Sequence, residues 1–232
     1  MSAADVEASV YKLLQRRGLC ASAQIQIKMS VKVRWCHLPA CRPLAFETTP
    51  QPLDATILWL VHSHVPESLT GFFNAVTLTG SARFLVPASF LAVIGLLAAR
   101  RRLEALLMAS SMVAAPVVVY VLKAAFERTR PALWDAPWYW GSSLPSGHTL
   151  SVATFATVAV LCALRIWPQR RWPVMLVTGF AILWTCAIAL SRLILGVHWP
   201  TDVLAAIVVG VVIPVLLRKL FDLHQSKWIE EN

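Results

Sequence analysis

The sequence predicts an all-α fold, a polytopic transmembrane helical bundle with about five spans and additional interfacial helices. Of its 232 residues, 57% are hydrophobic and 14% are charged, and the mean hydropathy is +0.63. Soluble domains carry roughly 25% charged residues, so the composition argues against a soluble enzyme. Five apolar runs approach the length of about 20 residues that a transmembrane helix needs. Arginine-rich hinges separate several of these runs.

Residues 1–52 differ from the rest of the chain. They are basic and hold no apolar run long enough to cross a membrane, so we expect a peripheral or poorly ordered N-terminal segment. The net charge of +9 does not indicate a nucleic-acid partner, because the basic residues do not form a groove-binding face. Cys36 and Cys41 flank His37, but no second ligand pair follows at the spacing of a metal site, so no metal is expected.

The next stretch, residues 54–79, is apolar but interrupted by polar residues. Asp54 is placed to cap a short helix that runs through about Val61, and Pro66 to open a second helix that runs through about Leu78. A broken and half-polar pair of helices favours an interfacial or re-entrant position over a transmembrane span.

The five apolar runs that follow are the predicted spans. They are residues 84–99, 103–122, 149–166, 172–190 and 203–217. The membrane-embedded domain is therefore expected over 53–222, with a cytoplasmic tail at 223–232. Basic residues concentrate on alternate connections, which the positive-inside tendency assigns to the cytoplasm. The other two connections, 124–147 and 192–200, are then expected to face the outside.

Three polar islands lie at the edges of these apolar runs, where a charge is costly unless it has a partner or a function. They are Lys123-x6-Arg130-Pro131, Pro145-Ser146-Gly147-His148 and Ser191-Arg192-x5-His198-x3-Asp202. All three belong to the connections expected to face the outside. The sequence therefore predicts that they form a single composite site at one membrane face.

Each of the three islands contains groups that bind anions. A lysine or arginine at the end of a span commonly just extends to the interface. Lys123, Arg130 and Arg192 together, however, would surround a phosphate with a point charge and two planar guanidinium groups. Ser146 is suited to the N-cap of the following helix, and Gly147 lets backbone N–H groups approach a bound oxygen at that helix terminus.

The two histidines of the islands suit acid–base and nucleophilic chemistry. His148, in the first turn of a predicted helix, can supply a proton to a leaving group. His198 and Asp202 are four residues apart, so the carboxylate can reach the imidazole if a helix begins near Pro200. Such contact would fix the tautomer and leave the other ring nitrogen free to attack. Alternatively, Asp202 is a helix N-terminal charge, and the two roles are compatible.

The order and spacing of the islands resemble the three-part motif of the phosphatidic acid phosphatase type 2 (PAP2) superfamily, over about residues 80–217. The resemblance implies that His198 forms a phosphohistidine intermediate, that Asp202 orients it and that His148 protonates the leaving oxygen. It further implies that the phosphoryl oxygens are bound by Lys123, Arg130, Ser146, Gly147 and Arg192. It implies no metal and no cofactor.

Membrane members of this superfamily generally have six spans, the first of which precedes an interfacial helix like 54–79. Residues 1–52 offer no such span, so we expect either five spans with interfacial helices or a displaced chain start. Tryptophan and tyrosine at positions 134, 138, 139 and 140 suit the headgroup level, as membrane anchors or as a surface for stacking substrate.

The expected activity is that of an integral membrane phosphatase with a lipid phosphate substrate and membrane lipids as its surroundings. Phosphatidic acid, phosphatidylglycerophosphate and undecaprenyl pyrophosphate are all open as substrates, as is the oligomeric state. A lipid phosphotransferase that uses the same phosphohistidine is the main alternative, and a non-catalytic membrane binding protein is a remote one. The expected location is the bacterial inner membrane, with the active site on the periplasmic face.

Overall fold

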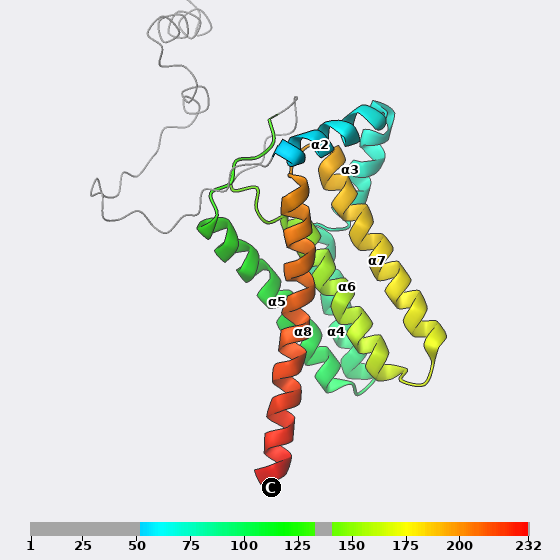
Figure 1. The fold of residues 1–232 in the computed structure, drawn as a ribbon. Helices are drawn as coiled ribbons and strands as arrows, with labels where there is room; N and C mark the ends of the chain where they lie inside the picture. The colour runs from blue at the N-terminus through cyan, green and yellow to red at the C-terminus, as the bar shows by residue number, and fades with distance from the viewer. Residues whose placement is uncertain (1–51, 133–140, 232) are drawn as a thin grey trace, which may run out of the picture. The chain divides into compact units, whose positions relative to one another are not determined.

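The computed structural model describes residues 52–132 and 141–231, and every regular element within these ranges is helical (Figure 1). The elements are α2 (Pro52–His64), a 3-10 turn (Glu67–Leu69), α3 (Thr70–Leu78), α4 (Ala82–Ala98), α5 (Arg102–Ala125), α6 (Gly147–Ile166), α7 (Arg171–Ile194) and α8 (Pro200–Glu231). The predicted N-terminal segment and the aromatic residues at 134–140 lie outside the described residues.

The all-α transmembrane fold is confirmed by the described part of the chain. It contains five stretches that are long and apolar enough to span a membrane, and these are Glu67–Ala98, Arg102–Ala125, Gly147–Ile166, Arg171–Ile194 and Pro200–Ser226. Large apolar side chains cover their outer faces; Phe180 and Leu183 of α7, for example, are 66% and 69% exposed. Helices that are apolar on every side are typical of a lipid environment.

Helix α6 forms the centre of the bundle. It packs against α5, α7 and α8, and half of its apolar window is buried, against 11% to 28% in the other spans. Its packing against α8 depends on Gly210, where an added Cβ would lie 2.7 Å from both the Leu150 carbonyl oxygen and the Ala153 Cβ. Glycine at this position therefore allows the two helix backbones to approach closely.

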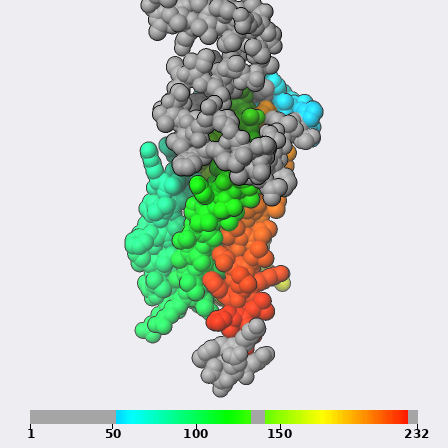
Figure 2. Space-filling view, turned by 90° about the vertical axis from the view of Figure 1, so that its left-hand side faces the viewer, coloured from blue at the N-terminus to red at the C-terminus, as the bar shows by residue number. Residues whose placement is uncertain are grey.

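The predicted alternation of the connections is visible in the arrangement of the helices. The hinge between α4 and α5, the hinge between α6 and α7, and the C-terminal part of α8 lie at one end of the bundle, opposite the polar islands (Figure 1). Helices α4, α5 and α8 lie side by side on one face (Figure 2).

Helix α8 extends well beyond the predicted span of 203–217, so the segment expected as a tail is helical through Glu231. Two contacts of Asp222 support the extension. Its carboxylate accepts a hydrogen bond from Arg165 at 2.8 Å and lies 3.6 Å from Arg218, one helical turn earlier.

The predicted helix pair at 54–79 is present as α2 and α3. Helix α2 continues to His64 rather than ending near Val61, and Pro66 then adopts an extended conformation before the 3-10 turn. Helix α2 lies across the end of the bundle that holds the islands, where it contacts α7 and α8. It is therefore positioned to contribute to the site.

Candidate active site

The structure brings the three islands together at one end of the bundle. The Lys123 ammonium at the end of α5 donates a hydrogen bond to the Ser142 carbonyl at 3.0 Å, and Trp199 Nε1 donates one to the Thr129 carbonyl at 2.8 Å. The Ser146 N–H also donates to the Asp202 carbonyl at 3.3 Å. The predicted composite site is therefore a set of connected loops and helix ends.

His198 enters the site because α7 ends in a tight reversal. Gly196 has a φ of 65°, and the Val197 N–H donates to the Arg192 carbonyl at 3.2 Å. This pattern is a Schellman motif, in which a residue in the left-handed conformation, usually glycine, ends the helix. The chain then continues through His198 into α8, and the imidazole is buried.

The hydrogen bonds of His198 assign its tautomer. Its Nδ1 lies 2.8 Å from the Ser143 carbonyl oxygen, and since a carbonyl only accepts, Nδ1 carries the proton. Its Nε2 is then left with a lone pair and lies 3.5 Å from the Arg130 guanidinium. The nitrogen available for attack on an electrophile is therefore Nε2.

The partner that fixes this tautomer is a backbone carbonyl, where the sequence suggested the carboxylate of Asp202. The nearest oxygen of Asp202 is 3.6 Å from Nδ1, close enough for electrostatic interaction but longer than a hydrogen bond. That oxygen, Oδ2, accepts a hydrogen bond from the Trp199 N–H at 2.9 Å. Asp202 thus occupies the third position of α8 and caps its N-terminus, as in a capping box. Asp202 therefore also has the position that the alternative interpretation gave it, as a negative charge in the first turn of a helix.

The environment of His198 favours a neutral imidazole. Burial lowers the pKa of His198 from its ordinary value of 6.5 to about 4, and the charges of Arg192 and Arg130 act in the same direction, while Asp202 opposes them. A neutral ring at physiological pH retains the lone pair that a nucleophile needs.

The three predicted cations lie in the same part of the structure as the two histidines. Arg130 donates to the Val197 carbonyl at 2.9 Å and to the Gly141 carbonyl at 3.2 Å. Arg192 is buried and donates to the Thr77 hydroxyl at 2.9 Å, so α3 also contributes to the site. The charges of all three cations act on His148. The arrangement therefore concentrates positive charge near the two histidines, as binding of a phosphoryl group requires.

The second island forms the start of α6. Ser146 stands at the N-cap position, as predicted, but its hydroxyl pairs with the Thr149 hydroxyl at 3.0 Å and makes no capping hydrogen bond. Gly147 is the first residue of the helix, and His148 follows it. The amide groups of this first turn lack intrahelical partners and are suited to an anion.

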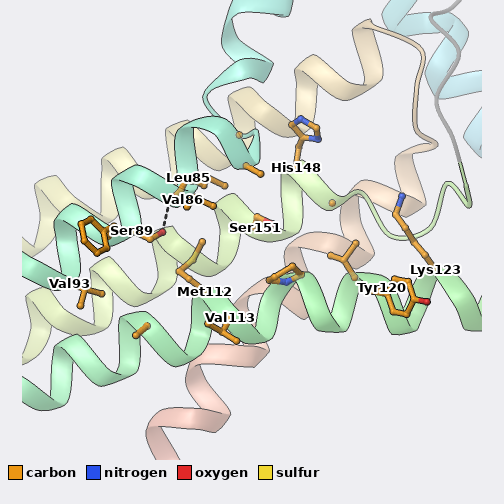
Figure 3. Close-up of a pocket in the computed structure, with 17 residues that line it drawn as sticks. Leu85, Val86, Ser89, Val93, Met112, Val113, Tyr120, Lys123, His148 and Ser151 are labelled. Atoms are coloured by element: carbon orange, nitrogen blue, oxygen red, sulfur yellow. Dashed lines mark hydrogen bonds between the residues drawn. The ribbon is translucent and has the colours of Figure 1, made fainter.

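An apolar cavity of about 710 Å³ lies between α4, α5 and α6 (Figure 3). Lys123, Gly147 and His148 contribute to its lining, and Lys123 lies at one end of the cavity in the view of Figure 3, with Val93 at the other. Most of the remaining lining is aliphatic or aromatic and includes Leu85, Val86, Met112, Val113 and Tyr120. The cavity therefore connects the cationic site with the apolar interior of the spans.

Two charged residues of this region were not identified from the sequence. Arg128 lies among the six unspecified residues of the first island, yet it is buried and bonded to the carboxylates of Asp54 and Asp202 at 2.6 and 2.5 Å. Asp54, which we expected only as a cap of its own helix, also accepts hydrogen bonds from the Thr201 N–H and hydroxyl at 3.0 and 2.8 Å. The presence of a second arginine two residues before Arg130 was the available signal.

Within residues 52–132 and 141–231, no three His, Cys, Asp or Glu side chains are grouped as a metal ion would require.

Comparison with known proteins identifies the relatives of this chain. Over residues 104–225, more than half of the chain, the sequence matches the family model of the PAP2 superfamily. It is 38% identical over 70 residues to phosphatidylglycerophosphatase B of Escherichia coli (strain K12), which is 30% of this chain and 25% of that protein. The match thus spans a quarter of that relative's length. With phosphatidylglycerophosphatase B of Bacillus subtilis (strain 168), identity is 28% over 154 residues, or 65% of this chain and 74% of the relative.

Two solved structures share the fold. The transmembrane PAP2-type phosphatidylglycerolphosphate phosphatase from Bacillus subtilis superposes with a TM-score of 0.67 and 25% identity, over 73% of this chain and 85% of that one. LpxE from Aquifex aeolicus gives a TM-score of 0.58 and 23% identity, over 75% of this chain and 99% of that one. The second likeness concerns the fold alone.

Proposed function

Because the chain belongs to the PAP2 superfamily, we propose that this integral membrane protein is a phosphatase that hydrolyses phosphate or pyrophosphate monoesters of lipids. One observation carries the proposal. A cluster of three cations and two histidines adjoins an apolar cavity inside the predicted spans. A lipid phosphate has matching chemistry, since its anionic group would bind the cluster while its hydrocarbon chain occupies the cavity.

The proposed reaction has two steps. In the first, the lone pair of His198 Nε2 forms a bond to phosphorus, the bond between phosphorus and the lipid oxygen breaks, and His148 gives its proton to that oxygen. In the second, His148 takes a proton from a water molecule, whose oxygen attacks phosphorus and breaks the nitrogen–phosphorus bond. The phosphate leaves and His198 is regenerated.

The remaining residues of the islands would bind the transferred group. Lys123, Arg130 and Arg192 would neutralise its non-bridging oxygens, and the first amides of α6 near Ser146 and Gly147 would donate hydrogen bonds to them. Positioning and charge stabilisation supply most of what phosphoryl transfer needs, so the proposed mechanism uses no metal and no cofactor. Asp202 would stabilise the positive charge that develops on His198.

The proposed location is the bacterial inner membrane, with the site on the periplasmic face. The basic hinges and the C-terminal part of α8 lie at the opposite end of the bundle from the site. The positive-inside tendency assigns that basic end to the cytoplasm.

The first test is His198→Ala in purified protein solubilised in detergent. Phosphate release would be measured in EDTA from phosphatidylglycerophosphate, phosphatidic acid and undecaprenyl pyrophosphate. We expect the wild-type protein to be active without added metal and to be inhibited by orthovanadate. Loss of the nucleophile should lower the rate by several orders of magnitude on each lipid that the wild type uses.

A matched control is His224→Ala, because His224 is exposed on the C-terminal part of α8, away from the site. Its activity should equal that of the wild type. Retention of more than about a tenth of the activity by folded His198→Ala protein would contradict the mechanism. Strict dependence on Mg²⁺ would also count against it. Labelled phosphate recovered on a lipid or sugar acceptor, instead of in water, would indicate the phosphotransferase.

A further inference from the structure

A buried ionic cluster lies next to the proposed nucleophile, outside the positions that the three islands specify. Arg128 Nη2 donates to Asp54 Oδ2 at 2.6 Å, and Nη1 donates to Asp202 Oδ1 at 2.5 Å and to the Thr201 hydroxyl at 2.7 Å. Arg128, Asp54 and Asp202 are only 5%, 1% and 0% exposed. The cluster connects α2, the loop after α5 and the N-terminus of α8.

The cluster leaves neither carboxylate free to rotate. The second oxygen of Asp202 accepts from the Trp199 N–H, and the second oxygen of Asp54 accepts from the Thr201 N–H. Each carboxylate is therefore bonded to the guanidinium on one side and to the first turn of α8 on the other. Because the guanidinium is planar and its donors are fixed in direction, it sets the angle of both groups.

Stability alone does not account for such a cluster. Burying charged groups carries a desolvation cost that their attraction often fails to exceed, and well-packed apolar residues of similar volume are commonly as stable. Here the charges are buried at the point where one of the two carboxylates faces His198 Nδ1 at 3.6 Å. This location favours a role in the geometry of the site.

The arrangement around His198 shows what the cluster would control. The Ser143 carbonyl holds Nδ1 at 2.8 Å, while the Asp202 carboxylate is kept at 3.6 Å, longer than a hydrogen bond. Without Arg128, the Asp202 carboxylate could turn toward Nδ1 and compete with the carbonyl, which would tilt the ring and move Nε2. Arg128, Asp54 and Asp202 are absent from the lining of the apolar cavity, so binding of the lipid chain would be unaffected.

We infer that Arg128 is a positioning residue that acts through Asp202 on His198, and that Asp54 of α2 holds Arg128 in place. Helix α2 then contributes, through Asp54, to the orientation of His198. The inference rests on the proposed function for its kinetic consequences. Its structural consequence, the orientation of the His198 ring, can be measured independently.

The kinetic test compares Asp54→Asn, Arg128→Lys and Arg128→Met with the wild type. Arg128→Met should lower kcat about 100-fold, the effect expected from a misplacement of about 1 Å, with KM changed by less than about twofold. Arg128→Lys keeps the positive charge, but a lysine cannot bond both carboxylates at once, so we expect kcat to fall about tenfold. Asp54→Asn, in which the side chain keeps nearly the same shape, should also lower kcat about tenfold.

A double variant tests whether Asp54 acts through Arg128. If it does, Asp54→Asn combined with Arg128→Met should be no slower than Arg128→Met alone, whereas independent effects would multiply. The matched control is Arg165→Met, which breaks an ion pair of 2.8 Å at the other end of the bundle. It should leave kcat and KM unchanged.

The structural test is the ¹⁵N NMR signal of the His198 ring in histidine-labelled protein, identified by its loss in His198→Gln. It should shift in Asp54→Asn and Arg128→Met and stay in place in Arg165→Met. Unchanged kcat and an unchanged ring signal in folded Asp54→Asn would overturn the inference, as would an effect on KM alone. If Arg128→Met does not fold, the kcat and the ring signal of Asp54→Asn decide whether the inference holds. A wild type without phosphatase activity but with a shifted ring signal in Asp54→Asn would contradict the proposed function and support the positioning role.

Discussion

The two ends of the helical bundle hold chemically identical ion pairs in opposite surroundings. At the end that holds the candidate site, Arg128 bonds Asp54 with side chains that are 4% and 1% exposed. At the other end, Arg165 bonds Asp222 with side chains that are 27% and 45% exposed. The two distances, 2.6 and 2.8 Å, are nearly equal. Burial therefore distinguishes the pair beside the candidate site from the pair at the opposite end of the bundle.

The same contrast in burial applies to other arginines of the sequence. Arg100, Arg101 and Arg102 form an exposed hinge, whereas Arg192 is 2% exposed and bonds Thr77 of α3. An exposed arginine keeps its hydration and costs little. A buried one requires partners from several elements, so it fixes the positions of those elements relative to one another.

The largest difference between the two ends is expected in stability. Arg128→Met should destabilise the protein by about 3–5 kcal/mol, because it leaves two buried carboxylates with one partner fewer. Arg165→Met should cost about 0–1 kcal/mol, as for exposed ion pairs in general. Thermal unfolding of both variants in the same detergent, followed by circular dichroism, measures the difference. Equal losses of stability would show that burial does not separate the two pairs.

Much of this division between the ends could be predicted from the sequence. Hydropathy and the alternation of basic hinges are properties of consecutive residues, so they located the spans and assigned the islands to one end. The motif spacings then predicted that His198, His148 and three cations share one site. Even the helix pair at 54–79 followed from its prolines and polar interruptions.

The ionic cluster could not be predicted in this way. Asp54 and Arg128 are 74 residues apart, as are Arg128 and Asp202, and no local spacing relates residues that meet only after folding. The Ser143 carbonyl that holds His198 is a backbone group, which every residue has, so the sequence carries no signal for it. The length of α8 was missed because polar side chains end an apolar run without ending a helix.

A second prediction, intermediate in its expected effect on stability, concerns the protonation of His198 at the end of the bundle that holds the candidate site. Since burial lowers the pKa of His198 to about 4, the folded protein binds this proton less readily than the unfolded chain, in which the pKa is near 6.5. The stability that depends on the neutral ring is thus complete above about pH 6.5 and is lost as the pH falls toward 4. Between pH 7 and pH 5 the loss should be about 2 kcal/mol.

The measurement is thermal unfolding at pH 7 and pH 5 for the wild type and for His198→Gln. The variant lacks this group, so its stability should fall less over the interval, and the two proteins should differ by about 2 kcal/mol in their pH dependence. Other carboxylates and histidines titrate equally in both proteins and cancel in the comparison. Identical pH dependence would mean that His198 is not held neutral by its surroundings.

The smallest effect on stability should come from the addition of a single methyl group at one of two glycines, Gly196 or Gly179. Gly196, just after α7, has a φ of 65°, whereas Gly179 lies within α7 and has no atom within 4 Å of an added Cβ. Gly196→Ala should destabilise the protein by about 1–2 kcal/mol, because other residues adopt this conformation only at a cost. Gly179→Ala should be neutral or stabilise by up to about 1 kcal/mol, since alanine favours the helix. Gly196→Ala should also slow phosphate release, because the turn delivers His198 to the site. Equal stability of the two variants in thermal unfolding would show that the reversal after α7 does not depend on glycine.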